Sequence, residues 1–530
     1  MRVFAVVCLL LASADAAAVD TILHNGKVWT GDTARPAATA IAIDGDRIVA
    51  VGDDTAILTL ATGDTRRIDL KGRRVVPGIN DAHTHVTVGL PSINLGFAPG
   101  NGGSEAVRAA IAAQPRSGER WITADIDMDA LHDPTLRRAG LDALQPERPV
   151  LLTGWTGHGA LVNSAAQRIL GLALDDVPPG GWLGRDATGA FDGRVYEYAQ
   201  WSPRTRLPER PERLREVIAS ESAALLKLGI TSIQNMAIGT TMPGFIDAWQ
   251  DTKTPLRLRA IRVPLALRPG EQPSDIGLPR ADPARPSVTV SGTKWILDGT
   301  PMERGAAMRP AYPGGSHGRL NFSQREIEAL LRETFTRGDQ VLLHVSGDAT
   351  LATVLDAMQS VATAEAWRAL RPRIEHGEGL TPDLVERARA FGVVLVQNPS
   401  HFMLPPTESA FMQAHALQPL ASVLKHGIPL ALGSDGPPSP WLNMLFAIAP
   451  ASRPDQGLTR EQALRAYTSG SAFAEFTERE KGRLAPGYLA DLAVLSQDVL
   501  DEALPAQALP GTSSLLTMIG GKVAWHDPAF

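Results

Sequence analysis

The amino-acid sequence predicts an α/β protein: a (β/α)8 barrel of the TIM type, with a large insertion after the first barrel strand and a small β-sandwich built from both chain ends. Three observations support this fold class. Short β-branched and apolar runs alternate with helical stretches through the middle of the chain, which is typical of parallel α/β architecture. Both ends carry short β-runs separated by tight-turn residues. One gap between barrel strands is far too long for a single crossover.

The composition is that of a large globular protein. The chain has 530 residues, of which 44% are hydrophobic and 20% charged, enough for a large buried core. A net charge of -6 is too small to indicate nucleic acid or an anionic membrane as a partner. The expected partner is a small-molecule substrate, and the sequence leaves a homo-oligomer open.

Residues 1–18 have the pattern of a cleavable secretory signal peptide. Arg2 supplies a positive charge, residues 3–12 are mostly apolar, and a triplet of alanines ends the segment. The apolar run is too short to span a bilayer, and a buried N-terminal strand is the alternative. We expect a periplasmic or secreted protein without a stable membrane anchor.

The single cysteine, Cys8, lies inside this predicted signal. The mature chain would then contain no cysteine, so disulfides could not stabilise it. A bound metal would have to be held by histidine, carboxylate or modified lysine.

The two ends of the mature chain, residues 19–74 and 482–530, are expected to form one β-sandwich. In the N-terminal part, runs such as residues 40–43 (AIAI) are separated by tight-turn signals such as Asn25-Gly26. The C-terminal part repeats this style, with a run over residues 490–495 (ADLAVL).

Residues 75–481 between these ends are expected to form the barrel. Eight short segments qualify as its strands: one leading to His83, then residues 229–235, 256–263, 288–296, 341–344, 373–376, 393–397 and 428–435. Helical stretches at 209–228 and 324–337 lie between strands. The gap at about residues 90–206 must hold an insertion with its own structure, including a strand at residues 149–152 (PVLL).

Polar side chains follow five of the predicted barrel strands. Active sites in such barrels form where the C-terminal ends of the strands meet, and an unpaired polar group is costly to bury there. His83 and His85 are spaced so that a strand would direct both imidazoles to one side. The remaining strand-end groups are Lys294, His344, His376 and Asp435.

Converging imidazoles and a carboxylate suit one or two divalent metal ions, zinc above all. Each residue alone has a simpler interpretation. The histidines could be surface or hydrogen-bonded core residues, Asp435 could cap a helix and Lys294 could be an ordinary charge at a sheet edge. Five strands of one barrel that all end in a metal-competent group are hard to obtain by accident, so the joint pattern favours a metal site.

Several motifs together resemble a known family. They are residues 76–85 (VPGINDAHTH), 157–158 (GH), 163–165 (NSA), 229–231 (GIT), 294–299 (KWILDG), 344–348 (HVSGD), 373–376 (RIEH), 433–435 (GSD) and 482–492 (GRLAPGYLADL). In these motifs the chain resembles the amidohydrolase superfamily, and within it the amidohydrolase-3 or YtcJ-like branch. The resemblance covers nearly the whole mature chain but does not define the substrate.

The resemblance implies two groups of metal ligands: His83, His85 and Asp435 for the more buried ion, and His344 and His376 for a second. It also implies that Lys294 bridges the two ions as a carbamate. A free ammonium cannot ligate a metal, whereas a carboxylated lysine presents a carboxylate on a long arm. Members of the superfamily hold one or two ions, so the number stays open here.

The predicted mechanism follows from the metal. A divalent ion lowers the pKa of bound water from about 15.7 to near 7, which provides hydroxide at neutral pH. Asp435 would act as general base towards this water and then as general acid towards the leaving amine. His158 is the candidate for holding the substrate carbonyl or its oxyanion, with a packing role as the alternative. Glu197, Tyr198 and Asp298 could line the pocket, solvated or capping roles being the alternatives.

Two positions depart from the expected pattern. Ser346 stands where many relatives carry a small apolar residue. His401, beyond the seventh strand, is expected in a surface loop, with a role at the rim of the site as the alternative.

The predicted function is therefore a metal-dependent hydrolase that cleaves a carbon–nitrogen bond in an amide or cyclic amide other than a peptide. An esterase or lactonase is the first alternative, because the same hydroxide attacks esters. A metal-binding protein without turnover is the second, but it would need a missing ligand or base.

Overall fold

The computed structural model describes residues 19–265, 267–272 and 286–530. The predicted signal peptide, Cys8 included, lies outside these described residues. Within them, every helix is too short or too polar to cross a bilayer.

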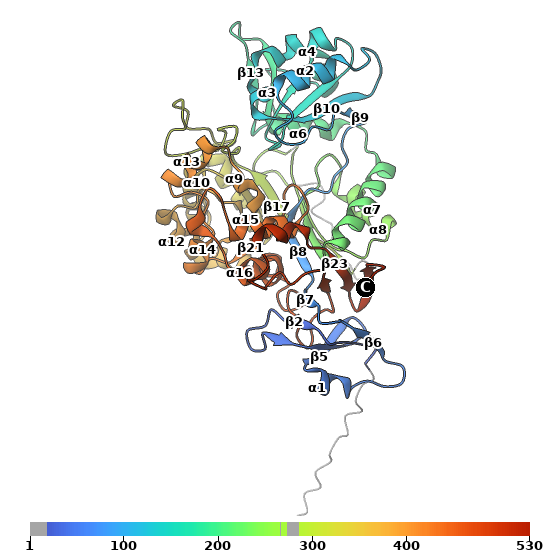
Figure 1. Ribbon diagram of the computed structural model, residues 1–530. Helices are drawn as coiled ribbons and strands as arrows, with labels where there is room; N and C mark the ends of the chain where they lie inside the picture. The colour runs from blue at the N-terminus through green and yellow to red at the C-terminus, as the bar shows by residue number, and fades with distance from the viewer. Residues whose placement is uncertain (1–18, 266, 273–285) are drawn as a thin grey trace, which may run out of the picture.

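An eight-stranded parallel sheet curls into the central barrel (Figure 1). The strands follow one another around it in chain order: β8 (Ile79–Thr84), β15 (Ile230–Asn235), β16 (Arg257–Arg262), β17 (Val288–Ile296), β18 (Val341–Val345), β19 (Arg373–His376), β20 (Val394–Gln397) and β21 (Leu430–Leu432). The two outer strands meet just beyond β21, where the Asp435 N–H donates to the His83 carbonyl at 3.0 Å. Each predicted barrel strand overlaps one of these, and the predicted fold class is confirmed.

Helices surround the barrel and connect its strands. They are α7 (Pro211–Lys227), α8 (Met242–Thr252), α9 (Gln324–Thr336), α10 (Asp348–Val361), α11 (Ala364–Leu370), α12 (Pro382–Ala390), α13 (Pro406–Ala414), α14 (Ala421–Lys425), α15 (Pro440–Ile448), α16 (Arg460–Arg465) and α17 (Ser471–Ala474). The stretches predicted at 209–228 and 324–337 correspond to α7 and α9. A capping box of Ser323 and Glu326 begins α9 and satisfies two backbone donors there.

The insertion after β8 forms a second sheet with its own helices, at the top of Figure 1. Its six strands have the order β13-β14-β12-β11-β10-β9. Their bounds are β9 (Ser92–Asn94), β10 (Trp121–Ile126), β11 (Val150–Gly154), β12 (Gly159–Val162), β13 (Gly181–Arg185) and β14 (Phe191–Glu197), with helices α2 (Ser104–Ala112), α3 (Met128–His132), α4 (Arg138–Leu144), α5 (Ser164–Leu170) and α6 (Tyr198–Trp201). The turn between β11 and β12 brings residues 155–158 to the mouth of the barrel.

The two chain ends lie together at the opposite end of the barrel (Figure 1). A six-stranded sheet has the order β24-β23-β22-β7-β2-β3, and a four-stranded sheet has the order β5-β4-β1-β6. The C-terminal strand β22 pairs with the N-terminal strand β7, which joins both ends in one sheet. The strands are β1 (Thr21–His24), β2 (Lys27–Trp29), β3 (Ala37–Ala38), β4 (Ala40–Asp44), β5 (Arg47–Gly52), β6 (Arg66–Asp69), β7 (Arg74–Pro77), β22 (Leu492–Leu495), β23 (Ser514–Ile519) and β24 (Lys522–His526), with the short helix α1 (Asp54–Leu58) after β5.

Gly78 connects the sandwich sheet to the barrel, since β7 ends at Pro77 and β8 begins at Ile79. A Cβ atom at this position would lie 2.1 Å from the Thr231 hydroxyl oxygen on the neighbouring barrel strand. The close approach therefore requires glycine, and it fixes where β8 enters the barrel.

Candidate metal centre

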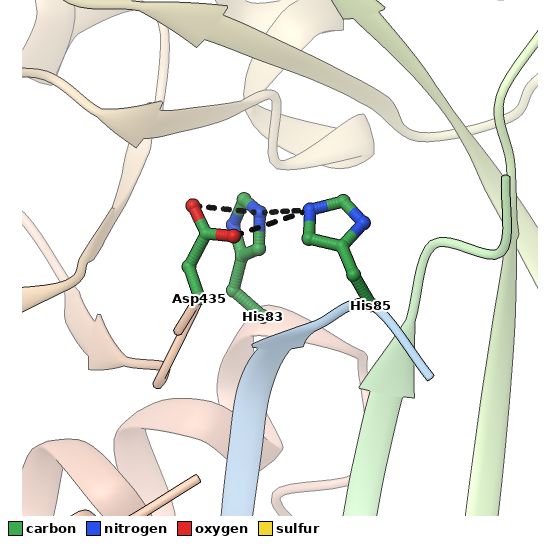
Figure 2. A group of neighbouring side chains, drawn as sticks. All are labelled: His83, His85 and Asp435. Atoms are coloured by element: carbon green, nitrogen blue, oxygen red, sulfur yellow. Dashed lines mark hydrogen bonds and ion pairs between the residues drawn. The ribbon is translucent and has the colours of Figure 1, made fainter. Parts of the chain in front are cut away.

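His83 and His85, from the end of β8, meet Asp435 from the loop after β21 (Figure 2). The Nε2 atoms of the two histidines lie 3.2 Å apart. Asp435 Oδ1 lies 3.2 Å from His85 Nε2, and its Oδ2 lies 3.5 Å from His83 Nε2. Groups far apart in the sequence thus present ligand atoms within 4.8 Å of one another, as a divalent ion requires.

Hydrogen bonds on the far sides of the rings set the orientation of these two histidines. His83 Nδ1 lies 2.7 Å from Glu375 Oε2, and His85 Nδ1 lies 2.8 Å from the Met236 carbonyl oxygen. Because a carboxylate and a carbonyl accept, Nδ1 carries the proton in each ring and Nε2 keeps its lone pair for a metal. Burial, followed by the Lys294 charge, lowers the pKa of His83 to about 4, which keeps this imidazole neutral.

Glu375 orients the His83 ring, and the sequence did not predict this role. Its carboxylate is fully buried and accepts from Arg373 Nε at 2.8 Å and Nη2 at 3.0 Å. Burial alone would raise the pKa of Glu375, but the Arg373 charge and the His83 hydrogen bond outweigh it and hold this pKa well below its usual range. The period of a strand places Arg373 and Glu375 on one face of β19, whereas His376 at the strand end departs from this period with its left-handed backbone (φ 70°).

His344 and His376 follow on β18 and β19, with ring centres 4.4 Å apart. His376 Nε2 lies 3.7 Å from Asp435 Oδ2, so the second pair adjoins the first group. Burial is the largest cause that lowers the pKa of both imidazoles well below the ordinary value, which keeps them neutral. Among the described residues His376 Nδ1 is buried without a hydrogen-bond partner, a costly state that an added ligand would relieve.

Backbone strain accompanies these side chains. His376 (φ 70°) and Asp435 (φ 38°) both adopt left-handed conformations, which cost a non-glycine residue on the order of 1–3 kcal/mol. Such strain persists where the surrounding structure enforces it, and here it occurs at two of the residues that gather at the barrel mouth.

Lys294 lies on β17 with its side chain at the same centre. Its Nζ is 3.4 Å from His83 Nε2 and 3.5 Å from Met236 Sδ, and the residue is 3% exposed. Burial and the Arg373 charge outweigh the attraction of Glu375 and Asp435 and lower the pKa of Lys294 to about 8. An ammonium at this position would repel a metal ion, whereas an uncharged amine can take up CO2.

His158 reaches this centre from the insertion, and its ring centre lies 4.5 Å from that of His344. Its Nδ1 lies 3.0 Å and 3.1 Å from the two oxygens of the buried Glu197 carboxylate. Burial would lower the pKa of His158, but the charge and hydrogen bonds of Glu197 outweigh it and raise this pKa to about 9. The raised pKa favours the protonated imidazole, which would suit a developing oxyanion at the barrel mouth.

The structure gives Tyr198 and Asp298 packing roles rather than places in the pocket wall. Both are fully buried. The Tyr198 hydroxyl accepts from the Ile296 N–H at 3.0 Å. Asp298 accepts from the N–H groups of Ser346 and Gly347 at 3.0 Å and 2.8 Å, and so fixes the loop after β18.

His401 lies at the rim of the site, which was the alternative to the expected surface loop. Its Nε2 lies 2.8 Å from the Asp435 carbonyl oxygen, and its ring stacks on that of His376 with centres 5.5 Å apart. A short 3-10 helix, η3 (Pro399–Phe402), turns the chain back towards the barrel axis and brings His401 to the rim.

Two cavities open onto this group of side chains. One, of about 470 Å³, extends beneath Trp201 and α7, and the other, of about 270 Å³, extends towards α15. Both are lined by Trp155 and His158 of the insertion and by His376 and Asp435 of the barrel. The candidate centre thus adjoins two cavities that could hold parts of a substrate.

This barrel and the converging ligands define a metal-dependent hydrolase as the class of protein. The family model "Amidohydrolase family" matches residues 66–524, so the chain belongs to this family, as the motifs predicted.

Similar proteins agree with this assignment. The chain is 28% identical to the N-substituted formamide deformylase of Arthrobacter pascens, over 91% of this chain and 94% of that protein. It is 24% identical to YtcJ of Bacillus subtilis, over 95% of this chain and 99% of that protein. In fold it is similar to an uncharacterized metal-dependent hydrolase from Pyrococcus horikoshii OT3, with a TM-score of 0.69, 21% identity and coverage of 91% of this chain and 98% of that one.

Proposed function

We propose that the protein hydrolyses a carbon–nitrogen bond of an amide or cyclic amide other than a peptide. The observation that carries this proposal is the convergence of His83, His85 and Asp435 at the mouth of the barrel. His376 lies 3.7 Å from the same carboxylate, and two cavities adjoin the group. The similarity to a formamide deformylase, whose name describes action on an amide, supports the choice of bond.

The side chains fit a divalent metal, with zinc the simplest choice for nitrogen and carboxylate ligands. His83, His85 and Asp435 would hold one ion, and His344 and His376 a second. When bound, such an ion supplies Lewis-acid activation of water and of the substrate carbonyl.

The other steps belong to the chain itself. Asp435 accepts the proton of the attacking water and transfers it to the leaving nitrogen. The His158 cation, held by Glu197, stabilises the negative charge that develops on the carbonyl oxygen. Trp155, which lines both cavities, helps to shield the reacting groups from bulk water.

Matched substrates test the type of bond. Purified protein of known metal content is assayed with a panel of N-acyl amides, formamides and lactams, and with the corresponding esters and lactones. We expect turnover of at least one amide class, with the amine released in a 1:1 ratio to the acid. Turnover confined to esters or lactones would identify the alternative enzyme class. Failure of both panels in fully metal-loaded protein would favour a metal-binding protein without turnover.

We further propose that Lys294 is carboxylated and bridges the two ions. The change Lys294→Ala should then lower both the metal content and kcat/KM. Loss of a residue that only supports a metal ligand costs roughly 10- to 100-fold, and loss of Lys294 should cost at least as much. Added short carboxylic acids should restore part of both by replacing the carbamate. The exposed strand lysine Lys522, changed to alanine, is the matched control. Unchanged metal content and rate in Lys294→Ala would rule out the bridge.

A further inference from the structure

The smaller cavity, of about 270 Å³, has a distinctive lining. Its walls are mostly apolar, with contributions from Met302, Leu404, Leu442 and Phe446. The polar groups among its lining residues include Glu378, from the loop directly after β19. Pockets of this kind bind an apolar group and use a few placed polar atoms to select it.

Glu378 carries a buried carboxyl oxygen that lacks a hydrogen bond, as His376 Nδ1 beside it does. The residue is 4% exposed, and its Oε2 atom is buried without a hydrogen-bond partner among the described residues. Its backbone is fixed, because the Glu378 carbonyl accepts from the Gln418 N–H at 2.7 Å. A buried acceptor without a donor carries the full cost of lost hydration, unless a bound molecule supplies the donor.

We propose that Glu378 determines substrate specificity, by accepting a hydrogen bond from an N–H or O–H group on an otherwise apolar substituent of the substrate. This inference rests on the proposed amide hydrolysis. Either protonation state of a carboxyl group offers an accepting oxygen, so the proposal needs no particular charge on Glu378.

The position of the carboxyl group limits where the donor lies in the substrate. A Glu378 oxygen, a His376 ring nitrogen and a His401 ring nitrogen all lie within 4.8 Å of one another. A donor about 3 Å from Glu378 is therefore only a few bonds from a carbonyl held at the candidate metal centre. The substrate class is an amide with an aryl or alkyl group in the smaller cavity and an amino or hydroxyl group near its scissile bond.

The same three residues could instead hold a cation, and the contacts argue against this. His401 Nε2 is engaged with the Asp435 carbonyl oxygen at 2.8 Å. His376 Nε2 lies 3.7 Å from Asp435 Oδ2, so this nitrogen adjoins the first group of ligands. The assay below makes metal binding by Glu378 one of its outcomes.

The test uses pairs of amides of equal size that carry either a hydroxyl or a methyl group near the scissile bond. Wild-type protein should prefer the hydroxyl member by roughly 10- to 100-fold in kcat/KM, the range expected for leaving a buried acceptor unpaired. The change Glu378→Leu should abolish this preference, whereas Glu378→Gln, which keeps an accepting oxygen, should retain most of it. Glu221→Gln, a similar change in the wall of the larger cavity, is the matched control and should leave the ratio unchanged.

A second measurement separates this inference from the proposed reaction. Calorimetry measures the binding of the matched acid or amine products to chelator-treated protein. In wild type, the product with the hydroxyl group should bind more tightly than the product with the methyl group. In Glu378→Leu, the two products should bind equally. Equal affinities and equal rates for both members in wild type would overturn the role of Glu378, even if amides are hydrolysed. Loss of metal in Glu378→Leu, with full metal in Glu221→Gln, would make Glu378 a metal ligand and also overturn it. If no amide is turned over but the binding preference is present, the proposed reaction fails and the recognition site stands.

Discussion

Replacing Asp435 with asparagine is expected to lower kcat/KM by about 10²- to 10⁴-fold, the contribution of a positioned general base. Asparagine has almost the same shape, and its carbonyl oxygen can still face His83 and His85, which lie 3.5 Å and 3.2 Å from the carboxylate oxygens. It cannot take a proton from water, however. Most of the metal should therefore remain while turnover is lost, as steady-state assays and metal analysis of the same samples will show.

The control for this change is Asp356→Asn on the outer face of α10, where the carboxylate is 56% exposed and pairs with Arg387. That variant should keep the wild-type rate, because an exposed pair contributes little to stability. A wild-type rate in Asp435→Asn would eliminate Asp435 as the base. A parallel loss of metal and activity would show that this carboxylate acts mainly as a ligand.

Much of the barrel could be predicted because strands such as β18 and β20 are short apolar runs with a polar residue at or near their end, although β15 and β16 contain several polar residues. Buried parallel strands need apolar side chains on both faces, so they stand out from the amphipathic helices between them. The eighth strand shows the limit of this reasoning. The predicted run of 428–435 reduces to Leu430–Leu432, since the chain leaves the ladder before Asp435 takes up its left-handed conformation.

The insertion was predicted from the length of the gap, but only one of its strands was. The run around β11 is continuous and apolar, as in a buried strand. In contrast, β13 and β14 contain glycines, arginines and an aspartate, and lack the alternation that indicates a half-buried strand. Their place in the sheet depends on pairing with each other and with β12, which a local pattern cannot reveal.

At the candidate site, sequence reasoning found the groups that follow strand ends but missed those that orient or flank them. Glu375 is one residue before His376, so strand alternation would place the two on opposite faces; both reach the site because His376 leaves the strand conformation (φ 70°). His401 lies in the short helix η3 and Glu378 in a loop, and the path of that loop depends on contacts such as that between Gln418 and the Glu378 carbonyl. The cavity that these two residues share exists only after the barrel closes.

Removal of the metal ions is expected to reduce turnover by at least about 1000-fold, because Lewis-acid activation contributes several kcal/mol to such reactions. Without an ion, the imidazoles of His83, His344 and His376 are neutral groups that can only form hydrogen bonds. The protein is treated with a chelator, freed of it, and titrated with zinc while rate and bound metal are followed. Activity should return in proportion to the ions bound, and saturation at one or two equivalents will give the number of ions needed.

The barrel itself should survive this treatment, because its core consists of packed apolar side chains between strands and helices rather than of metal ligands. Circular dichroism before and after chelation therefore serves as the control for folding. A chelated sample that retains its fold but loses its rate assigns the chemistry to the ions held at the barrel mouth. Full turnover in a sample with only trace metal would contradict the metal-dependent mechanism, and would leave Asp435 to activate water without an ion.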